Sequence, residues 1–205
     1  MSSFRKGATL IMGLALCISQ AAIAEEKKEG PELLTGATTE MLAYTCAGCH
    51  GPDGSSKGPA TPTIGGLSPE YFIEVMEAYK SGDTKGTIMN RIATGYSTEE
   101  FEQMAEYFAG QKFVAATSQK VEGDADKGAK HHEKYCEKCH SEGGTLADDD
   151  SGILTGQWSP YLAATLADFT SGDREMPKKM AKKLKTMMDK EGEEGLKDLL
   201  AFYAK

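Results

Sequence analysis

The sequence predicts an all-α protein built from two tandem domains of similar design. The pattern Cys-x-x-Cys-His occurs twice, at 46–50 and 136–140. The segments around the two copies also repeat, and their apolar residues recur at the three- and four-residue spacing of amphipathic helices. No convincing segment alternates apolar and polar residues as a half-buried strand does. Together these features indicate a duplicated helical unit.

Residues 1–24 have the features of a secretory signal peptide. Two basic residues precede an apolar run at 8–18, and Ala-Ile-Ala at 22–24 is typical of a cleavage site. The run is too short to span a bilayer. Cys17 raises the alternative of a lipoprotein, but the leucine before it is larger than a lipidation signal usually carries. We therefore expect a mature chain that starts at Glu25 and is periplasmic, without stable membrane insertion.

Charge and length limit the possible functions and the number of domains. The 205 residues carry a formal net charge of −8, and an acidic chain without basic runs argues against nucleic-acid binding. The length that remains after removal of the signal suits one ordinary domain or two small ones, and the duplication favours two. We expect a flexible arm at 25–36, a first domain at 37–110, a linker at 111–123 and a second domain at 124–205, each domain with one cysteine motif.

Each half is expected to contain a helix on either side of its cysteine motif. Short helices are predicted at 39–45 and 126–135, just before the motifs. "GLSPEYFIEVMEAYKSGD" at 66–83 then corresponds to "QWSPYLAATLADFTSGD" at 157–173. Ser68 and Ser159 are predicted N-caps with proline at the first helical position, and a glycine ends each helix. The final helices are expected around 101–110 and 196–205.

The two motifs are best explained as attachment sites for two covalently bound haem c groups. One zinc site made from both pairs would place them much closer in sequence, and a thioredoxin-like dithiol needs a βαβ setting. Two disulfides would leave the adjacent histidines unexplained. In a c-type site the thiols bond to the haem and the histidine becomes an axial ligand. The expected attachment residues are Cys46, Cys49, Cys136 and Cys139, with His50 and His140 as axial ligands.

The sixth ligands are expected to be methionines. Besides the two motif histidines the chain has only His131 and His132, which we interpret as part of a solvated helix face. In the first half Met89 lies in a loop between two predicted helices and can reach the iron. In the second half Met176 and Met180 both qualify, and Met176 is preferred because a following proline favours an extended loop. Histidine–methionine ligation raises the reduction potential relative to two nitrogens.

Further residues are expected to support these sites. A ligand histidine needs its second ring nitrogen held by an acceptor. The carbonyl of Pro62 is predicted to serve in the first half and that of Gly152 in the second. Arg91 and Arg174 lie near the ligand methionines, where each is either a partner for a haem propionate or an ordinary surface arginine.

Roughly residues 38–205 resemble the two-domain class I cytochromes c, most closely the cytochrome subunits of flavocytochrome c sulfide dehydrogenases. The likeness is carried by "CAGCHGPDG", "FIEVMEAYKSGDTKGTIMNRIATGYST", "KYCEKCHSEGG", "GQWSPYLA" and "MPKKMAKKL". It implies two class I cytochrome c domains related by pseudo-twofold symmetry. It also implies a heterodimer with an FAD-binding sulfide dehydrogenase subunit, the FAD being on that partner.

On this resemblance, sulfide is oxidised at the partner's flavin, and this chain has no catalytic site of its own. It passes electrons singly to a periplasmic acceptor such as a small cytochrome. The main alternative is a free-standing dihaem electron shuttle to a terminal oxidase. A dihaem peroxidase would need an open iron site, which a methionine available to each haem argues against.

Overall fold

The computed structural model describes residues 36–117 and 119–205. The expected signal peptide at 1–24 and all but the last residue of the expected arm lie outside the described residues. The described part, Gly36–Lys205, forms one compact unit that contains both sequence repeats.

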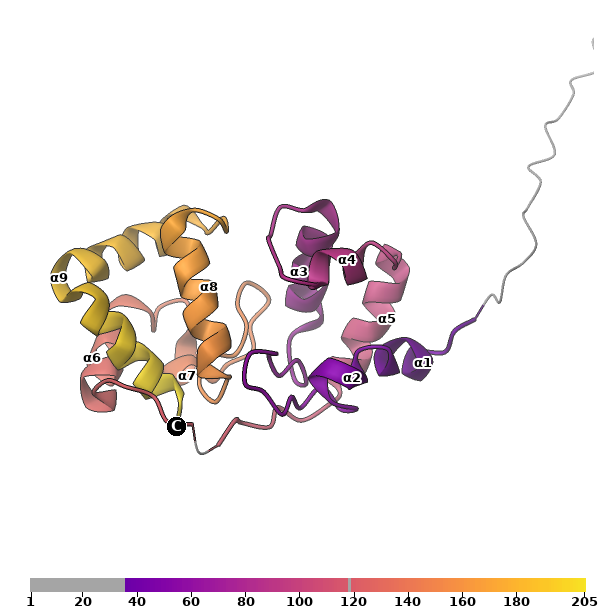
Figure 1. The fold of residues 1–205 in the computed structure, drawn as a ribbon, viewed down its shortest axis with the longest axis horizontal. Coiled ribbons are helices and arrows are strands. Elements are labelled where there is room, and N and C mark those ends of the chain that lie inside the picture. The colour runs from indigo at the N-terminus through magenta and orange to yellow at the C-terminus, as the bar shows by residue number, and fades with distance from the viewer. Residues whose placement is uncertain (1–35, 118) are drawn as a thin grey trace, which may run out of the picture. The chain divides into compact units, whose positions relative to one another are not determined.

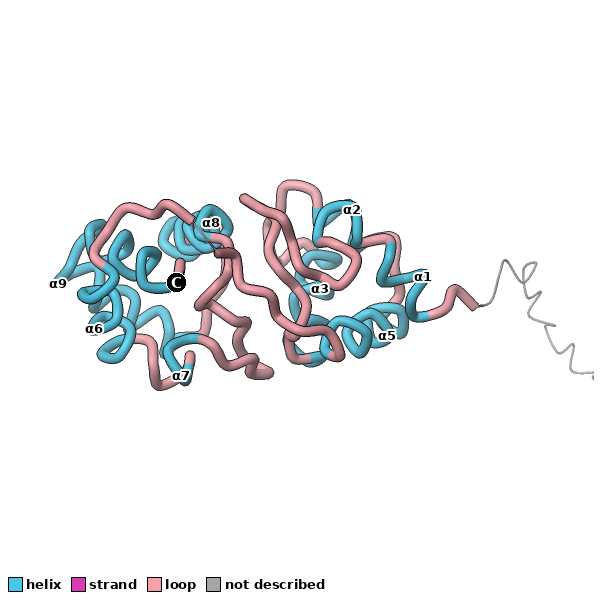
Figure 2. Tube along the Cα trace, turned by 90° about the horizontal axis from the view of Figure 1, so that it is seen from below, coloured by secondary structure: helices cyan, strands magenta, loops and turns pink. Residues whose placement is uncertain are grey.

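The described residues are helical, with no strand among them (Figures 1 and 2), which confirms the predicted fold class. The helices are α1 (Thr39–Tyr44), α2 (Ala47–His50), α3 (Pro69–Ser81), α4 (Met89–Ala93), α5 (Thr98–Ala109), α6 (Ala125–Tyr135), α7 (Ser141–Gly144), α8 (Ser159–Ser171) and α9 (Lys178–Tyr203). Extended backbone pairs only in two isolated bridges, Thr84 with Arg174 and Asp148 with Ser151, among these residues. None of the described helices is long and apolar enough to cross a membrane.

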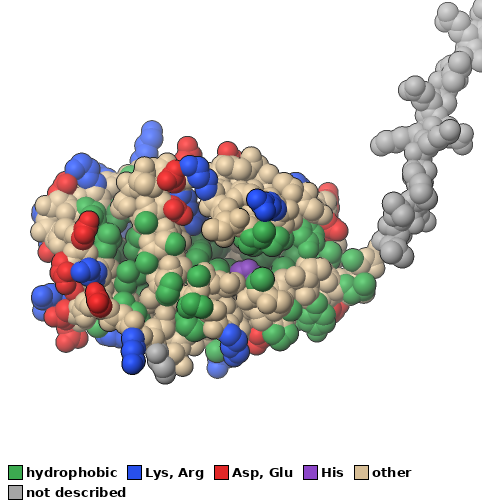
Figure 3. Space-filling model, in the orientation of Figure 1, with side chains coloured by type: hydrophobic (Ala, Val, Ile, Leu, Met, Phe, Trp, Pro, Cys, Tyr) green, Lys and Arg blue, Asp and Glu red, His purple; other side chains and the backbone are tan. Residues whose placement is uncertain are grey.

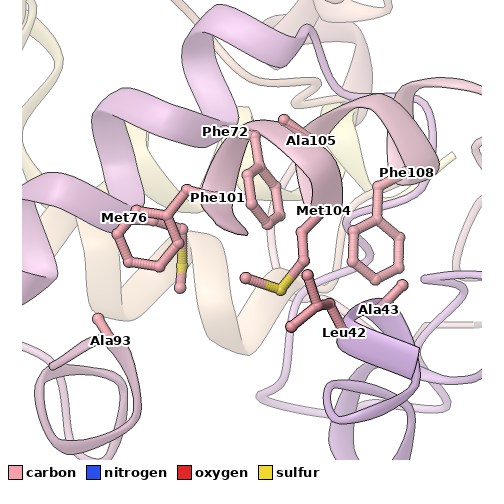
Figure 4. Packing of buried hydrophobic residues seen from close by; sticks show 9 residues of the cluster. All are labelled: Leu42, Ala43, Phe72, Met76, Ala93, Phe101, Met104, Ala105 and Phe108. Atoms are coloured by element: carbon pink, nitrogen blue, oxygen red, sulfur yellow. The ribbon is translucent and has the colours of Figure 1, made fainter. Parts of the chain in front are cut away.

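The core of the first half is formed by α1, α3 and α5. Phe101, Met104 and Phe108 come from one face of α5 and are fully buried, and Phe72 of α3 lies against Phe108 (Figure 4). The N-terminus of α5 is closed by a capping box, in which the Ser97 hydroxyl accepts from one backbone amide and a glutamate side chain accepts from Ser97. These contacts fix the helices between which the first cysteine motif lies.

The core of the second half is built mainly where α6 packs on α9, with α8 beside them. Its buried members are Tyr135, Leu162, Met187, Leu199 and Tyr203. The long α9 is interrupted at Gly192, which has φ 65° and ψ −159°. Glycine adopts this conformation without a steric cost, and Figure 1 shows the change of direction that it allows within α9.

The first turn of α8 differs from the expected one. Ser68 does cap α3 as predicted, accepting from the amide of Tyr71. Ser159 is not a cap: it is already helical, and its buried hydroxyl has no hydrogen-bond partner. Its backbone amide instead donates to Oε1 of Gln119 at 2.7 Å. The linker therefore supplies the acceptor that the sequence pattern assigned to serine.

Candidate haem-binding sites

The first motif forms a short helix that buries its histidine. Cys46 is the N-cap of α2 and Cys49 lies within it, and His50 ends this helix with only 9% of its surface exposed. Nδ1 of His50 lies 2.8 Å from the carbonyl oxygen of Pro62. This is the predicted partner, and it leaves Nε2 as the nitrogen that can bind a metal. In the space-filling view a histidine is visible within a recess bordered by hydrophobic side chains (Figure 3).

Met89, the predicted second ligand of the first site, stays a prediction, and the structure shows only its surroundings. It begins α4, is half-buried, and packs against the same core cluster as Cys46. Asn90, which sequence reasoning missed, holds this loop: its amide nitrogen donates to the carbonyls of Tyr79 and Thr84 at 2.7 and 2.8 Å. An asparagine directly after the candidate methionine was the available signal, because such a side chain readily bonds nearby backbone.

The positions of the other methionines of the first half argue against a role as the second ligand. Met76 and Met104 are buried in the hydrophobic core, and Met41 on α1 is 61% exposed. Met89, expected in a loop, instead begins the short helix α4, and it stays the predicted ligand of the first site.

The second motif borders a cavity of about 780 Å³. Cys136, Cys139 and His140 all line it, together with apolar residues of α8 and α9. Residues of α3, among them Tyr71, also line it, so the first half contributes to the wall of the second site. A cavity of this volume and apolar lining is of the size that holds a cofactor.

The surroundings of His140 correct one expectation. Its Nδ1 is buried and has no hydrogen-bond partner, so the predicted bond to the carbonyl of Gly152 is not formed. Asp148 and Ser151 close a tight loop just before Gly152, and the Ser151 hydroxyl lies 3.4 Å from the carbonyl oxygen of Cys139. This loop geometry replaces the arrangement found at Pro62 in the first half.

The second methionine ligand is not singled out by position alone. Met176 is half-buried in the extended segment before α9, and the residues on both sides of it, Glu175 and Pro177, line the cavity. Met180, in the first turn of α9, lines the cavity itself. Met187 also lines it but is fully buried in the core. The preference for Met176 over Met180 stays a prediction.

The interpretation of His131 and His132 as a solvated face was wrong. His132 is 2% exposed, and its two ring nitrogens lie 2.8 Å from the hydroxyl of Tyr203 and 2.6 Å from a carboxylate oxygen of Glu137. His131 is largely buried as well, with Nε2 3.5 Å from Asp198. Both histidines therefore join α6 to other parts of the second half.

The two arginines near the methionines differ. Arg91 is exposed. Arg174 is half-buried, lines the cavity, and holds its guanidinium 5.0 Å from the centre of the Phe169 ring. The position of Arg174 favours it as a partner for an acidic group bound in the cavity, whereas the exposed Arg91 fits an ordinary surface arginine.

Burial sets the protonation of the motif side chains. It lowers the pKa of both His50 and His140, which favours the neutral imidazole that binds metals. It also raises the pKa of the Cys46 and Cys136 thiols. These residues fit haem c: a free ring nitrogen at His50, paired cysteines beside each histidine, and an apolar cavity at the second motif.

Comparisons with known proteins agree with this assignment, although no protein-family model matches the chain. The cytochrome subunit of sulfide dehydrogenase from Chlorobaculum tepidum is 44% identical over 75 residues, which cover 37% of this chain and 67% of that protein. Cytochrome c4 from Pseudomonas aeruginosa is 32% identical over 145 residues, covering 67% and 72%. The thiosulfate dehydrogenase electron acceptor of Stutzerimonas stutzeri is 29% identical, covering 78% of both chains.

Solved structures share the fold. Thiosulfate dehydrogenase TsdBA from Marichromatium purpuratum matches with a TM-score of 0.72 and 22% identity, covering 82% of this chain and 39% of that longer one. Reduced cytochrome c4 from Pseudomonas stutzeri matches with a TM-score of 0.66 and 23% identity, covering 82% and 98%. The chain belongs to the family of dihaem, two-domain class I cytochromes c that includes cytochrome c4 and the cytochrome subunit of sulfide dehydrogenase.

Proposed function

We propose that this chain is the dihaem subunit of a flavocytochrome c sulfide dehydrogenase, and that it accepts electrons from an FAD-containing subunit. It then passes them singly to a downstream acceptor. The observation that carries the proposal is the 44% identity to a protein named as the cytochrome subunit of sulfide dehydrogenase. The duplicated motif, with His50 buried and His140 half-buried, supports it, since two one-electron sites suit the two electrons of one flavin oxidation.

The residues that would hold the haems are those of the two motifs and their methionines. Cys46, Cys49, His50 and Met89 form the first set, and Cys136, Cys139, His140 and Met176 form the second. When bound, each haem c supplies an iron that alternates between the ferrous and ferric states, one electron at a time.

The protein's own contribution is to position ligands and exclude water. Pro62 fixes the imidazole of His50 through a 2.8 Å contact, and Asn90 holds the loop that carries Met89. In the second site apolar residues of α8 and α9 line the cavity that half-buried His140 borders. Rigid ligands and a dry site keep structural rearrangement small during electron transfer, and a methionine ligand favours a relatively high potential.

We place the chain in the periplasm as one subunit of a heterodimer. The signal features of residues 1–24 support that location. Covalent haem attachment supports it as well, because it follows export of the chain. FAD belongs to the partner, and the downstream acceptor is a soluble periplasmic protein such as a small cytochrome.

Purification of the protein from its native host at low salt tests the proposal. We expect two covalently bound haems per chain and a co-purifying exported flavoprotein at one-to-one stoichiometry. A protein with two haems that purifies alone, and binds no flavoprotein when one is added, would reject the heterodimer while leaving the haem sites intact.

A second candidate is a free-standing dihaem shuttle. It is favoured by the relative named as a thiosulfate dehydrogenase electron acceptor, which matches 78% of both chains. The corresponding segment for sulfide dehydrogenase covers only 37% of this chain. The choice of donor therefore separates the two candidates.

A further inference from the structure

The side chain of Gln157 in the second half holds the backbone of Thr63 in the first half. Its Oε1 accepts from the Thr63 amide at 2.9 Å, and its Nε2 donates to the Thr63 carbonyl at 2.9 Å. Gln157 is 3% exposed and Thr63 is 1% exposed. The amide thus pairs with both polar groups of one residue, as a neighbouring strand would, at a position shielded from water.

Thr63 directly follows Pro62, whose carbonyl accepts a hydrogen bond from the His50 ring nitrogen. The carbonyl of Pro62 and the amide of Thr63 belong to one peptide unit. This unit is planar, so the directions of the two groups are linked. When Gln157 fixes that amide, it also fixes the direction of the carbonyl that orients His50. A contact path of three hydrogen-bonded or covalent steps therefore joins Gln157 to the axial histidine of the first site.

The next residue, Trp158, holds the same loop at its other end. Its Nε1 donates to the carbonyl of Ser56 at 3.3 Å. Its indole lies so close to Gly58 that a β-carbon there would come within 2.4 Å of the ring. Two consecutive residues of the second half thus hold the segment 56–63 at two points.

The first half does not hold the second site in the same way. Counting from the Ser-Gly-Asp sequences, the position equivalent to Gln157 is Leu67, which has no side-chain amide. The Nδ1 of His140 correspondingly lacks a partner. The loop that contains Gln157 also includes Leu154, which lines the second cavity and whose carbonyl accepts from the Gln157 amide.

We infer that Gln157 is a positioning residue for the first haem site, through which the second half sets the hydrogen bond to His50. This inference rests on the proposed haem ligation by His50. An acceptor on the second ring nitrogen raises the basicity of a ligand histidine, and a more basic ligand stabilises ferric iron. Loosening of the Pro62 carbonyl should therefore raise the reduction potential of the first haem and leave that of the second unchanged.

The test is a potentiometric titration of the fully loaded protein carrying Gln157→Leu, with NMR of the axial histidine ring protons. We expect the midpoint of the first haem to rise and that of the second to stay constant. The His50 ring proton should exchange with solvent about fivefold faster, the factor corresponding to one lost hydrogen bond. If Gln157→Leu loads haem poorly, Gln157→Met removes both polar groups at nearly the original side-chain length, and the same one-sided change is expected.

Gln119→Leu is the matched control. Gln119 also contacts this segment, through the carbonyl of Gln157 and the amide of Ser159, but it does not bond Thr63. It should leave both potentials unchanged. Unchanged midpoints in a loaded Gln157 variant, or equal shifts of both haems, would overturn the inference. Absence of covalent haem in the wild-type protein would instead reject the proposed function.

Discussion

Thr84 and Arg174 pair with each other in an isolated antiparallel bridge. Each directly follows a Ser-Gly-Asp sequence, so the two residues occupy equivalent positions in the two repeats. Contact between equivalent residues is the mark of a twofold axis, and this bridge is where the pseudo-twofold symmetry of the chain is most direct. The neighbouring charges break the symmetry. Lys85 pairs with Asp173, but the residue equivalent to Lys85 in the second repeat is Glu175, which has the opposite charge.

Removal of one pair of cysteines should remove one haem. In the double variant of Cys46 and Cys49 to alanine we expect one covalently bound haem by mass spectrometry of the denatured protein, against two in the wild type. The double variant of Cys136 and Cys139 is the matched partner and should also retain one. A loss of both haems in each variant, in folded protein, would contradict independent attachment.

The methionine assignments predict separate spectral losses. Met89→Ala should remove the near-infrared sulfur–iron charge-transfer band of the first haem only, and Met176→Ala that of the second, because each loses its sulfur ligand. Met180→Ala, with the same chemistry one turn farther along, should keep both bands. Loss of the second band in Met180→Ala and its survival in Met176→Ala would transfer the assignment to Met180.

Two serines at helix starts, Ser97 at α5 and Ser159 at α8, should respond differently to replacement by alanine. Ser97→Ala removes a capping-box acceptor and should lower the free energy of unfolding by about 1 kcal/mol. Ser159→Ala removes a buried hydroxyl that has no partner, so it should be neutral or stabilising. Urea denaturation of both holoproteins measures this. Equal destabilisation by the two changes would restore Ser159 as a cap.

Glu137 should give the second half a stability that depends on pH. The pKa of this carboxyl is held below its usual range by hydrogen bonds that favour the charged form. The backbone amide of Gly143 has the largest effect, followed by the His132 side chain and then by the amide of Glu142. A depressed carboxyl pKa stabilises the fold above the unfolded pKa, about 4.3, and the gain is lost as the pH falls through the folded value. Glu137→Gln should therefore be less stable than wild type at pH 7.

The difference should narrow as the pH falls below about 4, measured by urea midpoints across the acid range. Glu133→Gln is the control, because this exposed glutamate lies on α6, just before the turn that contains Glu137. A gap between Glu137→Gln and wild type that stays constant with pH would show that the carboxylate charge does not stabilise this loop.

Local patterns in the sequence were sufficient for several helices and for the hydrogen-bond partner of His50. The apolar spacing predicted α3, α5, α6 and α8, and the segment after the first motif predicted the carbonyl of Pro62 as the acceptor for His50. These features depend on residues near one another in the chain.

The features that sequence reasoning missed depend on distant residues. His132 was expected in solvent, but its partner Tyr203 lies 71 positions away. Ser159 was expected to cap α8, yet the acceptor comes from Gln119 of the linker, 40 positions earlier. The missing partner of the His140 ring nitrogen accompanies the loop closed by Asp148 and Ser151. Such tertiary contacts leave no local period or spacing to detect.

The most direct test of the central claim is the donor dependence of haem reduction. The purified chain is mixed with its flavoprotein partner, and the visible haem spectrum is followed after addition of sulfide or, separately, thiosulfate. The account predicts fast reduction of both haems by sulfide only when the flavoprotein is present, and no reduction by thiosulfate. Reduction by sulfide at the same rate without the flavoprotein, or reduction only through a thiosulfate-oxidising enzyme, would contradict it.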